Sequence, residues 1–244
     1  MTTIYWGNYP EDGIKWFELL LLNPAPALSE ISKARTTTAH GHFMQCPAFT
    51  AIYKNTYVIK SPIDIEVTYN AETKLVQASP QGQEFFDKNI TLRGHMVGDN
   101  DPFLMGIFIG YLFIATEECS IELIPASMHS SEFIDKTRLI SATFDIHKWY
   151  RPIEIAFEFK NKSDTIKIKR GDPLAYVRFT NSNGTKISLE RKEFPKETLD
   201  AVDACVTVKK SSLHLPLKTL YELAEPLRNK LGLKKKCPFN WRNK

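Results

Sequence analysis

Residues 138–179 read RLISATFDIHKWYRPIEIAFEFKNKSDTIKIKRGDPLAYVRF, and this stretch decides the fold class. Residues 153–159 and 165–169 alternate between apolar and polar side chains, the period-two pattern of strands that bury one face. A third run, residues 174–179, follows Gly171, which tolerates the positive φ of a tight turn. Three strands at such short spacing predict an antiparallel meander within one contiguous sheet.

Apolar or alternating runs elsewhere in the chain predict further strands. They lie at residues 4–6, 16–22, 57–60, 63–69, 74–78, 103–115, 121–125 and 186–191. The run at 4–6 is short and is closed by Gly7, which predicts an edge strand. Polar residues at 70–73 and 181–184 predict hairpin turns. The sequence therefore predicts a mainly β (α+β) fold with an antiparallel core.

The pattern becomes helical near the end of the chain. Residues 195–206, and a second stretch that starts at Leu217, place apolar side chains on one stripe of a helix. Pro226 predicts a kink in the second helix. We expect a β-rich core domain at residues 1–192, a helical segment packed on it at 193–232, and a basic aromatic tail at 233–244.

The composition is that of an ordinary globular protein, with 43% hydrophobic and 25% charged residues among 244. Lys and Arg exceed Asp and Glu by 32 to 28, and a net charge of +4 is too small to favour nucleic-acid binding. The four cysteines are far apart, so they match neither a zinc knuckle nor a redox pair. Without a signal-like start or a long apolar run, we expect a soluble, intracellular, cytoplasmic protein with no membrane partner.

The central stretch resembles the β-clip fold of dUTPases and dCTP deaminases. In that family a strand ends in an aspartate, as at Phe144-Asp145, and a turn with an aromatic residue follows, as at Tyr150-Arg151. The Gly-Asp-x-x-Ala turn of the family is matched at residues 171–175. The resemblance implies a β-clip core, or a related jelly roll, that binds Mg²⁺ and a pyrimidine nucleotide. It implies Asp145 as the catalytic base and a set of ligand-binding residues, namely Ser127, Ser130, Tyr150 and Arg151.

The chain departs from that family at several positions. Pro152 stands where the family has glycine, and Tyr176 stands where it has glutamine. The Arg-Ser-Ser phosphate motif and the glycine-rich C-terminal arm are missing from the sequence. An alternative interpretation makes Asp145 a turn cap and pairs Arg151 with Glu154, so that these residues hold the fold instead of a nucleotide.

The whole chain is also similar to proteins of T4-like cyanophages that carry no assigned function. The stretches that carry this similarity are Cys46-Pro47-Ala48 with residues 54–67, and residues 236–241. The similarity implies a viral, bacteriophage protein that acts in the host cytoplasm.

Two further groups of residues are candidates for binding. Asp145 and His147 lie two apart, as a carboxylate and an imidazole would on one strand of a cupin-like metal site. The tail combines positive charge with aromatic side chains, which fits a docking segment for a protein partner or for self-association, or else a solvated end of the chain. Its candidate residues are Lys234, Lys235, Lys236, Phe239 and Trp241.

These observations favour a non-enzymatic β-rich module that acts in phage assembly or in host or partner interaction. The first alternative is an enzyme that binds or hydrolyses a nucleotide, with Asp145 at its centre. The second is a cupin-like metal-dependent enzyme, with Asp145 and His147 as ligands.

Overall fold

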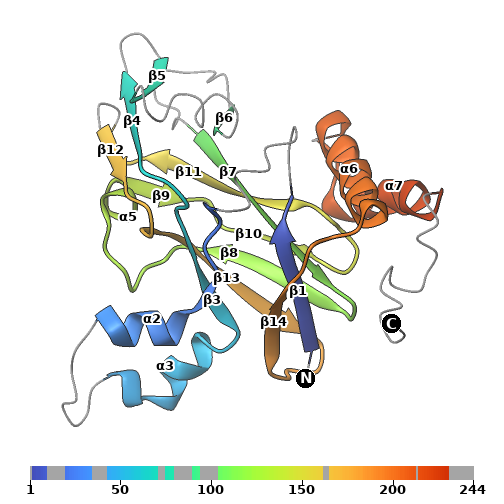
Figure 1. The fold of residues 1–244 in the computed structure, drawn as a ribbon, viewed down its shortest axis with the longest axis horizontal. Helices are drawn as coiled ribbons and strands as arrows, with labels where there is room; N and C mark the ends of the chain where they lie inside the picture. Colours follow the sequence, from blue (N-terminus) through green and yellow to red (C-terminus); the bar gives the residue numbers. More distant parts are fainter. Residues whose placement is uncertain are drawn as a thin grey trace.

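The computed structural model describes residues 2–9, 20–34, 43–70, 75–79, 90–93, 104–161, 165–212 and 214–230 (Figure 1). The fold is mainly β with helices near the C-terminus, as predicted. Every described strand pairing is antiparallel except that of β1 with β14. The β-clip or jelly-roll topology and the domain boundaries stay predictions.

Among the described residues, sheet A contains six strands. Five of them follow the order β14 (Ile187–Arg191), β1 (Thr2–Asn8), β7 (Leu104–Ala115), β11 (Pro152–Phe159) and β9 (Thr137–Leu139), and β6 (Ile90–Arg93) also pairs with β7. The strand predicted at residues 4–6 is therefore not at an edge, because β14 and β7 flank it. The prediction was wrong because β14, which covers β1, lies almost the whole chain away in sequence.

Two smaller sheets complete the β structure. Sheet B has the order β10 (Ala142–Asp145), β8 (Cys119–Ile124), β13 (Pro173–Asn181), β3 (Thr56–Lys60) and β2 (Ala25–Pro26). Sheet C has the order β12 (Thr165–Ile168), β4 (Ile65–Asn70) and β5 (Leu75–Ala78). The predicted hairpin of β4 with β5 is confirmed. Of the strand predicted at 16–22, only residues 20–22 are described, and they lie outside any strand.

The predicted meander is wrong, although its three strands are where the sequence placed them. β11, β12 and β13 enter sheets A, C and B respectively. The turn between β12 and β13 hydrogen-bonds to the loop between β3 and β4: Gly171 donates its backbone N–H to Ser61, at 2.8 Å, and Ser61 donates to the carbonyl of Asp172, at 2.9 Å. Because β12 pairs with β4 and β13 with β3, these four strands form one antiparallel ribbon that bends from sheet C into sheet B.

The turn at residues 181–184 forms, with Gly184 at a φ of +59°, but it does not close a hairpin. After this turn the chain leaves sheet B, and β14 pairs in parallel with β1 in sheet A. The buried side chain of Asn181 donates to the hydroxyls of Thr2 and Thr185, at 2.9 and 2.7 Å. Contacts with the N-terminal strand therefore override the local hairpin signal.

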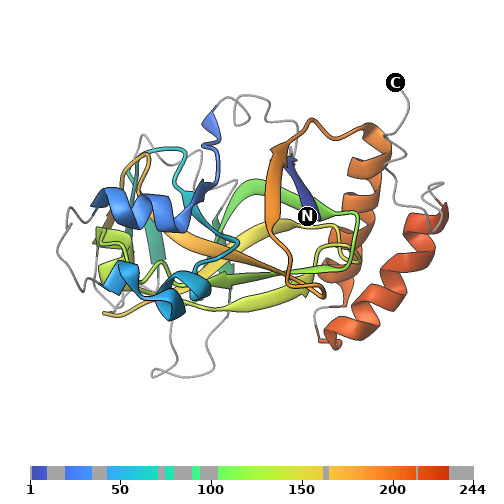
Figure 2. The same cartoon turned by 90° about the horizontal axis from the view of Figure 1, so that it is seen from below.

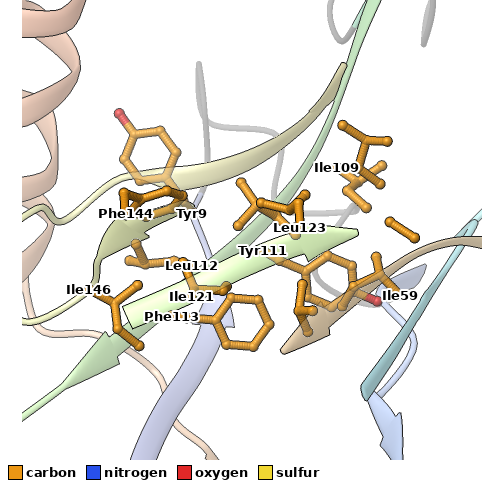
Figure 3. Close-up of a cluster of buried hydrophobic side chains, with 14 of the residues drawn as sticks. Tyr9, Ile59, Ile109, Tyr111, Leu112, Phe113, Ile121, Leu123, Phe144 and Ile146 are labelled. Atoms are coloured by element: carbon orange, nitrogen blue, oxygen red, sulfur yellow. The ribbon is translucent and has the colours of Figure 1, made fainter. Parts of the chain in front are cut away.

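The main core lies where sheets A and B face each other. The rings of Phe113 on β7 and Phe179 on β13 lie 5.3 Å apart, and both side chains are buried. Figure 3 shows apolar side chains of β7 gathered with Ile121 and Leu123 of β8 and with Phe144 of β10. A second cluster, around Tyr176, forms where α2 (Ala27–Ala34) and α3 (Pro47–Ile52) cover sheet B.

The two C-terminal helices lie side by side at one end of the sheets (Figures 1 and 2). They are α6 (Lys196–Ser211), whose N-cap is Pro195, and α7 (Leu217–Lys230), which contains Pro226. α6 buries four apolar side chains in the main core: Ala201, Val202, Cys205 and Val208. The remaining described helical segments are α5 (Glu132–Lys136) and a short 3₁₀ helix, η2 (Phe43–Gln45). None of the described helices has the length and apolar character needed to cross a bilayer.

Candidate binding site

An open hollow lies between the end of β10 and the start of α7. Its volume is about 350 Å³. Seven residues line it: Thr143, Phe144, Asp145, Lys148, Leu217, Lys218 and Tyr221. The hollow thus includes Asp145, the residue that the sequence singled out, beside residues of a helix more than seventy positions later in the chain.

Asp145 uses its polar atoms to hold local structure. Its Oδ1 accepts a hydrogen bond from the hydroxyl of Ser120, at 2.7 Å, and its carbonyl accepts from the backbone N–H of Trp149, at 2.8 Å. Its Oδ2 lies 3.7 Å from the Nζ of Lys148. These contacts fix the turn after β10, so the alternative interpretation of Asp145 as a structural residue agrees with its surroundings.

Tyr221 of α7 closes one side of the hollow. Its hydroxyl accepts a hydrogen bond from the backbone N–H of Asp145, at 2.8 Å, and its ring lies 5.7 Å from that of the buried Trp149. Burial raises the pKa of the Tyr221 hydroxyl above its usual value of 10.0. The hydroxyl therefore stays protonated near neutral pH and remains a donor as well as an acceptor.

His147 does not join Asp145 in a recognisable metal site. The Nδ1 atom of His147 lies 3.3 Å from both the backbone nitrogen and the carbonyl oxygen of Cys119. Among the residues that the structure describes, no three His, Cys, Asp or Glu side chains are grouped to hold a metal ion. The described residues therefore offer no third ligand for a cupin-like metal site at Asp145 and His147.

Tyr150 and Arg151 lie against the core beside β11. Tyr150 is buried, and the guanidinium of Arg151 lies over the ring of Phe144, 5.4 Å from its centroid. The Nη2 atom of Arg151 lies 3.9 Å from Oε2 of Glu154, so the pairing expected from the alternative interpretation is present. The same carboxylate oxygen lies 3.0 Å from Nζ of Lys209, and this contact ties α6 to sheet A.

The serines proposed for phosphate binding lie away from Asp145. Asp145 pairs with Ser120 at one end of β8, whereas Ser127 and Ser130 follow the other end of that strand. Four residues of strand, about 13 Å, separate Ser120 from Ile124 alone. Ser130 donates to a carboxylate oxygen of Asp135, at 3.1 Å. The structure therefore brings together Asp145, Tyr221 and the lysines, but not Asp145 with the serines.

Several candidate residues lie outside the described part of the chain. They are the tail residues Lys234, Lys235, Lys236, Phe239 and Trp241.

No motif or pattern in the sequence marked Thr143, Leu217, Lys218 or Tyr221 as site residues. A hydrophobic residue at the first position of a helix is a weak signal, and Leu217 is 37% exposed. Only the packing of α7 against β10 brings these side chains to one place. No family model and no curated protein matches the sequence.

Proposed function

We propose that the protein is a non-enzymatic interaction module that recognises a protein partner through the hollow beside β10. One observation carries this proposal: an apolar hollow with lysines on its rim opens beside an edge strand, while Asp145 binds Ser120 and Trp149 within the fold. Concave sites that combine apolar walls with a few polar groups are where proteins bind ligands and peptide segments. In the phage setting that the sequence similarity implies, the partner is an assembly component or a host protein.

The nucleotide-enzyme alternative requires Asp145 to act on a ligand together with phosphate-binding groups. The carboxylate of Asp145 accepts from Ser120, and Ser127 lies beyond the far end of β8. A general base must reach the proton that it removes in a plausible substrate pose. This arrangement favours binding over catalysis.

A thermal-shift panel separates the two functions. The full-length protein is heated with each pyrimidine triphosphate, with and without Mg²⁺, and the expected result is an unchanged Tm. A shift that the Asp145→Asn variant abolishes would contradict the interaction module and favour the enzyme.

Partner binding itself is tested with the full chain and with a variant that lacks residues 233–244. Sizing and pull-down measurements compare the two proteins against candidate assembly proteins. We expect association to weaken without the tail while the far-UV circular dichroism stays unchanged. If the shortened protein associates as the full chain does, the tail takes no part in the interaction.

A further inference from the structure

The outer edge of β10 is the most specific feature of the hollow. Ile146 donates its backbone N–H to Cys119, at 3.0 Å, and thus faces β8, whereas Asp145 donates to Tyr221 and faces outward. Backbone groups in an antiparallel pair alternate in direction, so Thr143 faces outward as Asp145 does. β10 is the last strand of sheet B, and no described strand pairs with this edge. The N–H and C=O of Thr143 are therefore placed to pair with an added strand.

The side chains around this edge favour an acidic segment. Two lysines, Lys148 and Lys218, and one carboxylate, that of Asp145, line the hollow. The side chain of Lys148 is 49% exposed, and Lys218 is exposed. Lys148 lies 3.7 Å from Oδ2 of Asp145, so Lys218 supplies the one positive charge of the lining that this carboxylate does not balance. An incoming carboxylate would be attracted to this rim.

The floor of the hollow is apolar. Leu217 is 37% exposed and lies with Phe144 and the ring of Tyr221 in the lining. A strand presents alternate side chains to one face, so an acidic residue and an apolar residue two positions apart would meet the lysines and Leu217 together.

From this geometry we infer that β10 takes an extended, acidic-and-apolar peptide segment of the partner as an added strand. The inference rests on the proposed function and names the chemistry of the partner.

Charge favours this peptide over two alternative occupants, a second copy of the protein and the protein's own tail. A second copy paired edge to edge across a two-fold axis would bring its own Lys148 and Lys218 to the same place, and like charges repel. The chain's own tail, residues 233–244, contains five basic residues and no acidic one.

The test uses fluorescence anisotropy with the full-length protein and two labelled octapeptides. One repeats Glu-Thr-Val-Thr, which places glutamate and valine two positions apart on one face, and the other replaces each glutamate with lysine. We expect the acidic peptide to bind, the basic peptide not to bind, and the affinity to fall as salt is raised.

Two sets of variants locate the binding site. Lys148→Glu with Lys218→Glu should weaken binding of the acidic peptide by about tenfold or more. The matched control, Lys169→Glu with Lys196→Glu, makes the same charge change at exposed residues away from the hollow and should bind as the wild type does. Thr143→Pro removes the outward N–H, a substitution that an edge strand tolerates, and should also weaken binding.

Three results would overturn the inference. One is equal weakening by both lysine pairs, which would show a general effect of charge. Another is a dimer in sizing that Thr143→Pro dissolves, which would make a second copy the occupant. The third is tighter peptide binding after deletion of residues 233–244, which would make the tail the occupant. Partner association that survives Lys148→Glu with Lys218→Glu would leave a non-enzymatic module standing and refute the hollow as its binding site. The nucleotide panel tests separately whether the protein is an enzyme.

Discussion

Replacement of Gly106 by alanine is a direct test of how α6 is held on sheet A. Gly106 lies in β7 opposite Ala156 of β11, and an added Cβ would lie 2.2 Å from Oε1 of Glu154. Gly106 is not among the residues with positive φ, so alanine introduces no strain in the backbone. The whole effect of the substitution must therefore pass through the displaced carboxylate of Glu154.

The size of the effect follows from the surroundings of that carboxylate. The side chain of Glu154 is 10% exposed, and its ion pair with Lys209, at 3.0 Å, is largely buried. Breaking a buried pair costs about 3–5 kcal/mol. The side chain of Lys209 is 18% exposed and can regain some water, which reduces this cost. Gly→Ala itself adds about 0.5 kcal/mol of stability. We therefore expect the free energy of unfolding to fall by about 2 kcal/mol in total.

The assay is a double-mutant cycle with Glu154→Ala, measured by urea unfolding and followed by the fluorescence of the buried Trp6 and Trp149. In the Glu154→Ala background the carboxylate is gone, so Gly106→Ala should stabilise the protein by about 0.5 kcal/mol, and the coupling free energy should be about 2.5 kcal/mol. If the two substitutions prove additive within about 0.5 kcal/mol, the carboxylate of Glu154 does not need the space that Gly106 leaves in order to hold α6.

Three further predictions concern stability. Asn55 has a φ of +58°, and its side chain hydrogen-bonds the backbone of Thr185 and Ile187. Asn55→Ala should therefore lower the free energy of unfolding by about 1 kcal/mol more than Asn55→Gly, because only glycine adopts positive φ without strain. Equal losses in the two variants would contradict this prediction. The buried hydroxyl of Thr198 has no hydrogen-bond partner among the described residues. Thr198→Val should therefore stabilise the protein by about 1 kcal/mol in the same assay. Destabilisation would show that the hydroxyl has a partner after all. Burial raises the pKa of the Cys119 thiol from 9.0 to about 12. The folded state thus holds this proton more tightly, and stability should be complete below pH 9 and fall as the pH rises toward 12, by up to about 1.4 kcal/mol per pH unit; an unchanged slope in Cys119→Ala would refute the assignment.

The sequence predicted where most strands lie but not how they pair. The alternation at residues 153–159 and 165–169 marks strands, because a half-buried strand needs an apolar side chain at every second position. Pairing depends on partners that periodicity does not reveal: β12 meets β4, about a hundred residues earlier, through Thr165 and Thr68, whose hydroxyls lie 2.9 Å apart. A local turn signal was therefore outweighed by long-range contacts.

The candidate site was likewise only partly predictable from the sequence. Asp145 was singled out because the central stretch resembles dUTPases, in which a strand ends in an aspartate, and it does line a hollow. Its interpretation as a turn cap came from the sequence, but its partners Ser120 and Tyr221 come from β8 and α7 and were visible only in three dimensions. Leu217 and Lys218 lacked any motif, since the packing of α7 alone places them beside β10.

The position of β1 has a consequence for synthesis on the ribosome. β1 leaves the exit tunnel long before its neighbour β14, which ends at Arg191. Until then the nascent chain must keep Ile4 and Trp6, which are buried in the finished protein, from aggregating or mispairing. We therefore expect the growing chain to need chaperone protection until β14 has left the exit tunnel.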